Sequence, residues 1–121
     1  MPETWIEEWI GVDLDRTLAY YDELVDEYTI GEPIPEMVYR VVDWLVQGKR
    51  VKIFTARVST EGRGADWSLD QVIYAIQDWT EKHIGQRLEV TCIKDRGCRE
   101  IWDDRAIGVI PNTGIRTDGE E

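Results

Sequence analysis

The chain has 121 residues, of which 42% are hydrophobic, and its 14 Lys and Arg against 25 Asp and Glu give a net charge of −11. This length predicts one domain with a single core, and a composition with six Trp and five Tyr excludes a disordered acidic chain. The charge disfavours a nucleic-acid partner, because carboxylates repel phosphate backbones. No apolar run is long enough to span a membrane, and the first ten residues hold three Glu and no basic residue. We therefore expect a cytoplasmic protein without a secretory signal or a membrane anchor.

The first half of the chain predicts a strand, a loop and a helix. An apolar, β-branched stretch in residues 6–14 predicts a buried strand that stops at Asp13 and Asp15. Residues 18–32 are acidic and aromatic and predict a loop, with room for a short helix over 21–28. Apolar residues recur on one helical face from 37 to 46, with Pro35 in the first turn and Gly48 at the expected end.

The second half predicts one further strand and helix, followed by three short strand candidates. Residues 49–55 predict a short strand, and residues 56–67 predict a surface loop. Ser68 and Gln71 form a capping pattern that opens a second helix, which ends at Gly85. Residues 88–93, 100–102 and 106–110 are three strand candidates, and residues 111–121 are expected to fray. Cys92 and Cys98 are expected to be ordinary reduced thiols.

The order of these elements predicts the fold class. Strands that alternate with helices of about 10–15 residues imply right-handed crossovers and a mainly parallel sheet. We therefore predict an α/β fold, a single three-layer α/β/α sandwich that occupies residues 1–121 as one domain.

Polar residues follow each predicted strand of this sheet, where ligands of open parallel sheets bind. The residues concerned are Asp13, Asp15, Thr17, Thr55, Lys94, Asp103 and Asp104. Such a set suits phosphoryl transfer. Carboxylates bind Mg²⁺ or attack phosphorus, a Thr hydroxyl and a Lys ammonium bind the phosphoryl oxygens, and a second carboxylate transfers a proton.

The segments that carry these residues read DLDRTL, VKIFTAR, TCIKD and IWDDRAIGV. They resemble, in order and over nearly the whole chain, the four motifs of the haloacid dehalogenase superfamily of phosphohydrolases. The resemblance is greatest to small members without a cap domain from bacteria and phages, whose IGxPIP, IFTAR and DDRA segments are echoed at residues 30–35, 53–57 and 103–106. It implies the Rossmann-like core of that superfamily.

The resemblance also implies roles for the acidic residues. Asp13 is expected to be the nucleophile and a Mg²⁺ ligand. Asp15 is expected to be the general acid and base, and to bind the metal through its carbonyl. Asp103 is expected to complete the metal site, with Asp104 behind it. The superfamily usually has Gly after the second Asp, where this chain has Arg16, which either crowds the turn or offers the phosphate a cation.

Thr55 and Lys94 are expected to bind the phosphoryl oxygens, although Lys52 or Arg96 competes with Lys94 because short strands are hard to place. The Lys of the third motif is often followed by Pro, and here Asp95 and Arg96 follow.

Further substrate contacts are expected from Thr17, from Tyr20 with its neighbour Tyr21, and from Arg57. For Arg57 a second interpretation stays open, in which it pairs with an acidic residue on the surface.

The predicted function is a Mg²⁺-dependent phosphomonoesterase that forms an aspartyl-phosphate, acting on a small phosphorylated metabolite such as a nucleotide or sugar phosphate. Without a cap domain, residues 18–32 and 56–67 or a second copy of the chain are candidates to enclose the substrate. The alternative is an interaction protein, either a catalytically silent member of the fold or an acidic mimic of nucleic acid. A receiver domain is disfavoured, because its acceptor Asp follows a later strand than its acidic pair.

Overall fold

The computed structural model describes residues 7–21 and 26–119. Its four strands form one sheet in the order β3-β2-β1-β4, and every pair is parallel. The strands are β1 (Trp9–Val12), β2 (Val51–Phe54), β3 (Glu89–Thr91) and β4 (Cys98–Trp102). Helix α1 (Pro35–Val46) connects β1 to β2, and α2 (Leu69–Ile84) connects β2 to β3. The predicted α/β fold with a parallel sheet is confirmed.

Local sequence sets the ends of both helices. Pro35 occupies the first turn of α1, where its missing N–H has no intrahelical partner to lose, and Gly48 follows the helix with a φ of +83°. The backbone N–H of Gln71 donates to the Ser68 hydroxyl at 3.3 Å, which caps α2, and Gly85 ends it with a φ of +100°. These predicted helix signals are all confirmed.

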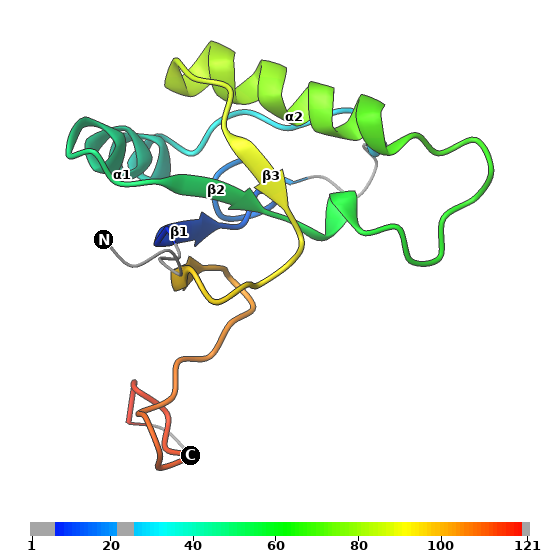
Figure 1. Cartoon of the computed structure of the whole chain (residues 1–121). Coiled ribbons are helices and arrows are strands. Elements are labelled where there is room, and N and C mark those ends of the chain that lie inside the picture. The colour runs from blue at the N-terminus through cyan, green and yellow to red at the C-terminus, as the bar shows by residue number, and fades with distance from the viewer. Residues whose placement is uncertain (1–6, 22–25, 120–121) are drawn as a thin grey trace.

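The core lies between the sheet and the two helices, which cover the same face of the sheet (Figure 1). Alternate strand residues point toward the helices, because successive side chains of a strand face opposite sides. The fully buried members include Val12 and Ile53 from the sheet, Val41 from α1, and Val72 and Ile76 from α2. Burial of these side chains fixes how the helices sit over the strands.

The opposite face of the sheet is covered at Trp9 by the connection between β3 and β4. Trp9 is only 2% exposed, its indole N–H donates to Asp95 at 2.8 Å, and the Lys52 ammonium lies 4.6 Å from its ring centre. The described residues place no helix on this face. The structure therefore supports a small α/β fold, and the third layer stays a prediction.

Several element boundaries differ from the sequence predictions. The strands predicted over 49–55 and 88–93 are shorter, and the predicted loop 56–67 begins with a 3₁₀ helix, η1 (Ala56–Val58), capped by Thr55. The strand predicted over 6–14 is β1, whose first predicted residue lies outside the described part. The proposed short helix over 21–28 falls largely on residues 22–25, which also lie outside it, and residues 26–28 form no helix.

The strand predicted over 106–110 is wrong. Residues 105–117, here called the C-terminal arm, leave the sheet and turn back on themselves, with only an isolated bridge between Val109 and Arg116. The N–H of Ile110 donates to the carbonyl of Ile115 at 2.7 Å, and that of Thr117 to Gly108 at 2.9 Å. The arm satisfies these backbone groups internally, around a turn at residues 111–113. The expected fraying of residues 111–121 stays a prediction.

Among the residues that the structure describes, no helix is long and apolar enough to cross a membrane. Cys92 and Cys98 are not joined by a disulfide.

Candidate functional site

The carboxyl ends of β1 and β4 bring three carboxylates together. Val12 and Trp102 are register partners at the ends of these neighbouring parallel strands, and the N–H of Asp13 donates to the carbonyl of Trp102 at 2.9 Å. The residues that follow, Asp13, Asp103 and Asp104, each offer a carboxylate oxygen within 4.8 Å of the others. We call these three residues the acidic cluster. The sequence analysis expected Asp13 and Asp103 to meet, and the parallel register is the reason that they do.

Thr17 links the two strand ends. Its hydroxyl donates to the Asp13 carboxylate at 3.3 Å and accepts from the N–H of Asp104 at 3.2 Å. The N–H of Arg105 donates to the Asp103 carboxylate at 2.9 Å. Thr17 was predicted as a substrate contact, and the structure places its hydroxyl between members of the acidic cluster.

The cluster concentrates negative charge around Asp13. Partial burial, the charge of Asp103, and the hydrogen bond and charge of Asp104 raise the pKa of Asp13 to about 7, with a smaller contribution from the charge of Asp15. Among the described residues, no Lys or Arg forms an ion pair with any of the three cluster carboxylates.

The acidic cluster borders an open cavity of about 730 Å³ at this end of the sheet. Other predicted site residues also line it, namely Asp15, Thr55 and Arg57. Four Arg residues of this acidic protein line the same cavity: Arg16, Arg57, Arg63 and Arg105. Acidic and basic side chains thus line one volume large enough for a small phosphorylated molecule.

Asp15 has a counterion of its own. The Arg57 guanidinium donates two hydrogen bonds to the Asp15 carboxylate, from Nε to Oδ2 and from Nη2 to Oδ1, each at 2.8 Å. Such a bidentate pair fixes the carboxylate in one orientation. The Asp15 side chain therefore does not belong to the acidic cluster, and its predicted metal contact through the carbonyl stays a prediction.

Arg57 is a buried anchor, since it is 7% exposed. Its Nη1 donates to the carbonyls of Thr29 at 2.9 Å and Glu27 at 3.0 Å, with a longer contact to Asp26. The structure thus pairs Arg57 with an acidic residue, but the pair is partly buried, whereas the sequence interpretation placed it on the surface. Its predicted contact with substrate stays a prediction, because these partners occupy the guanidinium.

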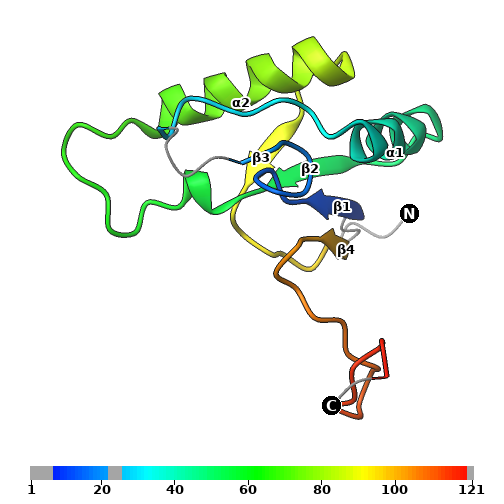
Figure 2. The ribbon, with the colours of Figure 1, turned by 180° about the vertical axis from the view of Figure 1, so that it is seen from behind.

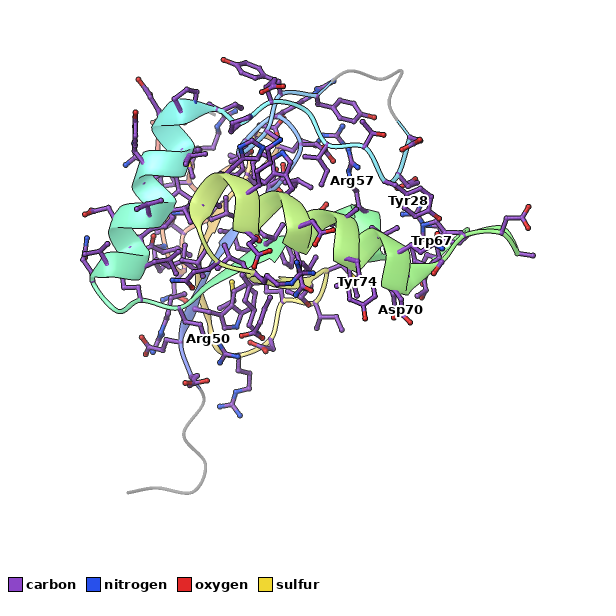
Figure 3. The ribbon with its side chains drawn as sticks, turned by 90° about the horizontal axis from the view of Figure 1, so that it is seen from above. Tyr28, Arg50, Arg57, Trp67, Asp70 and Tyr74 are labelled. Atoms are coloured by element: carbon purple, nitrogen blue, oxygen red, sulfur yellow. The ribbon has the colours of Figure 1, made fainter. Side chains whose placement is uncertain are left out.

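A second arginine, Arg63, contacts both Arg57 and the loop that Arg57 binds. Arg63 donates to the Glu27 carboxylate at 2.6 Å and to the carbonyl of Arg57 at 3.1 Å, and its guanidinium lies 4.8 Å from the centre of the Trp67 ring. Seen from above, Arg57, Tyr28 and Trp67 lie near one another where α2 begins, and Arg50 lies at the other end of the strands (Figure 3). Arg63 was missed by the sequence analysis, because a loop residue shows no periodicity.

Thr55 is placed as the sequence analysis expected, at the end of β2 and at the wall of the cavity. It is 3% exposed, and its hydroxyl oxygen accepts from the N–H of Arg57 at 3.2 Å. Because that oxygen acts as acceptor, the hydroxyl proton can still be donated to an oxygen in the cavity. The same backbone turn therefore positions Thr55 and Arg57 together.

Three predicted site residues do not line the main cavity: Thr17, Tyr20 and Lys94. Lys94 is exposed and lines a second cavity of about 530 Å³ that shares Asp103 with the first. Tyr20 is 59% exposed and lines neither cavity, whereas Tyr21 lines the main one. The position of Tyr20 and Tyr21 after the first strand does not predict which way either ring points. Lys52, the competitor of Lys94, packs against Trp9 on the opposite face of the sheet.

Arg16 has a left-handed backbone, with a φ of +73°, and its guanidinium lies 5.7 Å from the centre of the Tyr21 ring. This is a conformation that favours Gly, which the sequence analysis noted as the usual residue of the related motif. The side chain lines the main cavity. Arg16 is therefore accommodated in the turn with strain, and it adds a cation to the cavity wall.

The donor set of the acidic cluster fits a hard divalent cation. Three carboxylates at this separation offer the oxygen ligands that Mg²⁺ prefers, and the rest of its coordination comes from water and substrate oxygens. Asp104 is one of the three, although it was predicted to lie behind the ligands.

The chain matches no protein-family model, no curated protein and no solved structure.

Proposed function

We propose that the protein is a Mg²⁺-dependent phosphohydrolase that acts on small phosphomonoesters through an aspartyl-phosphate, with the core of the haloacid dehalogenase superfamily. The observation that carries the proposal is the acidic cluster at the mouth of the main cavity, where Asp13 and two further carboxylates meet without a protein counterion among the described residues. The three-layer sandwich of that superfamily is part of the proposal.

In the first step, a carboxylate oxygen of Asp13 attacks the phosphorus of the ester. The phosphorus–oxygen bond to the leaving group breaks as the aspartyl-phosphate forms, and Asp15 donates a proton to the leaving oxygen. Both Asp15 oxygens accept from Arg57 in the structure, so in the proposal Asp15 takes up a proton and one oxygen leaves the guanidinium before this transfer. The Thr55 hydroxyl donates to a phosphoryl oxygen from the end of β2.

In the second step, water attacks the aspartyl-phosphate. Asp15 takes a proton from the water, the bond between phosphorus and Asp13 breaks, and inorganic phosphate leaves. Asp13, Asp103 and Asp104 would hold the Mg²⁺, which when bound supplies positive charge that offsets the repulsion between the phosphoryl group and the cluster. For Lys94 to bind the phosphate as proposed, its side chain has to turn from the second cavity toward the main cavity.

The substrate is expected to be small. The main cavity has about 730 Å³, and its wall carries Arg16, Arg105 and the ring of Tyr21. These groups suit an anionic ester with a polar or planar leaving group. The total charge of −11 disfavours a polynucleotide.

The test is the hydrolysis of p-nitrophenyl phosphate with Mg²⁺ and with EDTA. The wild type is expected to release phosphate only with Mg²⁺, and Asp13→Asn to lose at least about 1000-fold in rate. The matched control is Asp66→Asn, at an exposed position outside both cavities. Hydrolysis in EDTA, or full activity of Asp13→Asn, would overturn the proposal. Binding of Mg²⁺ without turnover of any phosphomonoester would favour the catalytically silent alternative.

A further inference from the structure

The turn that follows β1 holds a large side chain against the preference of its backbone. Arg16 comes directly after Asp15 and has a φ of +73°. Among the described residues, only Arg16 and Asn112 have a positive φ without being Gly, and Asn tolerates this region better than Arg. Backbone strain of this kind gathers at sites of binding and catalysis, where the surrounding structure maintains it.

Hydrogen bonds and the core fix the shape of this turn. The N–H of Arg16 donates to the carbonyl of Ala19 at 2.8 Å, and the N–H of Ala19 donates to the carbonyl of Leu14 at 2.9 Å. Leu14, Leu18 and Ala19 are fully buried, whereas Arg16 is exposed. Figure 2 shows this part of the chain, in blue, as a tight loop just beyond β1. The fold therefore fixes the backbone of Arg16 and leaves its side chain outside the core.

The Arg16 side chain lines the main cavity together with Asp13 and Asp15. Its guanidinium lies 5.7 Å from the centre of the Tyr21 ring, which lines the same cavity, and the negative face of an aromatic ring attracts a cation at this distance. A guanidinium is always charged and donates paired N–H groups to phosphate oxygens. The turn of the proposed nucleophile thus carries a permanent cation at the cavity wall.

Two of the other arginines of the main cavity hold loops together. Arg57 donates to Asp15 and to backbone carbonyls of residues 26, 27 and 29. Arg63 donates to the Glu27 carboxylate and to the carbonyls of residues 56, 57 and 59. The fourth, Arg105, is exposed, and no hydrogen bond or ring contact with a described residue holds its side chain. Arg16 is therefore the arginine that both lies beside the proposed nucleophile and has a ring contact at the wall.

Lys94, which the sequence analysis expected to bind the phosphate, lies elsewhere. It is exposed and lines the second cavity, and among the described residues no Lys lines the main one. The cation expected from the third strand end is thus absent from the wall of the main cavity, while the first strand end supplies one in Arg16.

We propose that Arg16 binds the phosphoryl group that is transferred, and that it does so in place of Lys94. The proposal rests on the proposed function. The guanidinium donates to phosphoryl oxygens while Asp13 attacks, and its charge offsets part of the repulsion between the phosphate and the acidic cluster. A glycine would relieve the strain of the turn but would remove this cation, which accounts for an arginine at a left-handed position.

The test measures the binding of inorganic phosphate by isothermal titration calorimetry, at one fixed Mg²⁺ concentration. Arg16→Gln should weaken binding at least about tenfold, because it removes a charge-assisted contact, and Arg16→Lys should lose less because it keeps the charge. Lys94→Gln should lose less than Arg16→Gln. The control is Arg87→Gln, which removes the same charge from an exposed ion pair with Asp78 outside both cavities and should leave binding unchanged.

Arg16→Gly separates a binding role from a structural one. Glycine adopts the left-handed backbone without a side-chain clash, so this variant should unfold at the same urea concentration as the wild type or at a higher one. It should nevertheless bind phosphate as weakly as Arg16→Gln. If Arg16→Gln does not fold, as circular dichroism shows, Arg16→Gly carries the test.

Hydrolysis of p-nitrophenyl phosphate by the same variants separates this proposal from the proposed function. We expect kcat/KM to fall at least about tenfold in Arg16→Gln and Arg16→Gly. A wild type that binds phosphate through Arg16 but releases none from the ester overturns the proposed function and still supports Arg16 as the phosphate ligand. Unchanged phosphate binding and kcat/KM in the folded Arg16 variants, or a larger loss in Lys94→Gln, overturns the role of Arg16. A wild type with neither turnover nor phosphate binding overturns both.

Discussion

Two carboxylates that follow the same strand have opposite surroundings. Asp13 lies among other carboxylates, and its pKa is raised to about 7 by burial and by the charges of Asp103 and Asp104. Asp15, two residues later, is held by two hydrogen bonds from the buried Arg57 guanidinium. One group therefore lacks a cation within the described structure, and the other has one built into it.

The difference separates two kinds of charged site. A buried ion pair such as Asp15 with Arg57 satisfies itself, and its removal leaves an unpaired charge. In the acidic cluster the charges repel one another, and the proposed Mg²⁺ would offset that repulsion. Substitutions in the two regions should therefore change the free energy of unfolding in opposite directions.

The largest effect is expected from Arg57→Gln. The substitution leaves Asp15 without its cation and three backbone carbonyls with fewer donors, so the free energy of unfolding should fall by about 3 kcal/mol. Urea unfolding followed by circular dichroism measures it. The control is Arg99→Gln, which removes an exposed ion pair with Glu8 and should change stability by less than about 1 kcal/mol.

The double variant sharpens this result. If the loss at Arg57 comes from the unpaired Asp15 carboxylate, Arg57→Gln with Asp15→Asn should be less destabilised than the sum of the two single variants. Strict additivity would show that the ion pair does not account for the loss.

The next effect is stabilisation of the acidic cluster by Mg²⁺. At about ten times its dissociation constant, a ligand that binds only the folded state adds about 1.4 kcal/mol, which thermal denaturation detects as a higher Tm. The wild type should show this shift, and Asp103→Asn should show much less of it at the same Mg²⁺ concentration. A matched increase of Na⁺ controls for general screening. A shift that Asp103→Asn keeps in full would place the cation elsewhere.

A smaller effect of opposite sign to that of Arg57→Gln is expected from Asp13→Asn. In EDTA at pH 8 the variant should be more stable than the wild type by about 1–2 kcal/mol, because it removes a repelled charge whose solvent screening limits the gain. Denaturant unfolding measures the difference. A destabilised Asp13→Asn would mean that the carboxylate makes a net favourable contact.

The pH dependence of this difference has a definite sign. The folded-state pKa of Asp13, about 7, lies above its ordinary value of 3.8, so the folded chain binds the proton more tightly than the unfolded chain. In EDTA, wild-type stability relative to Asp13→Asn should therefore fall as the pH rises from about 4 to 7 and stay level above it. A difference that does not change with pH would contradict the raised pKa.

The smallest effect is expected from Arg16→Gly. A φ of +73° disfavours a side chain, so the glycine should raise the free energy of unfolding by about 0.5 kcal/mol after its greater freedom in the unfolded chain is counted. Asn112→Gly is the matched comparison, since Asn112 has a φ of +67° in the C-terminal arm and Asn tolerates that region better than Arg. A loss of stability in Arg16→Gly would show that contacts of the Arg16 side chain outweigh the strain.

The sequence by itself determined the order of the four strands and the two α-helices, and the helix ends, but it also predicted a strand over 106–110 that does not form. The cap at Ser68 and the left-handed glycines at Gly48 and Gly85 act within a few residues, and the structure has them as predicted. The sequence also predicted that the polar residues after the strands lie close together, because the carboxyl ends of parallel strands share one edge of a sheet. Asp13, Thr55 and Asp103 could therefore be assigned to one cavity before any contact was known.

Only the tertiary structure decided which partner each of these side chains has. Asp15 and Arg57 are 42 residues apart in the chain, and their pairing depends on how η1 packs against the loop after β1. The contact between the N–H of Asp104 and the Thr17 hydroxyl likewise joins residues that are far apart in the chain. Local sequence sets backbone preference over a few residues, whereas pairing between distant side chains is fixed only when the core brings their elements together.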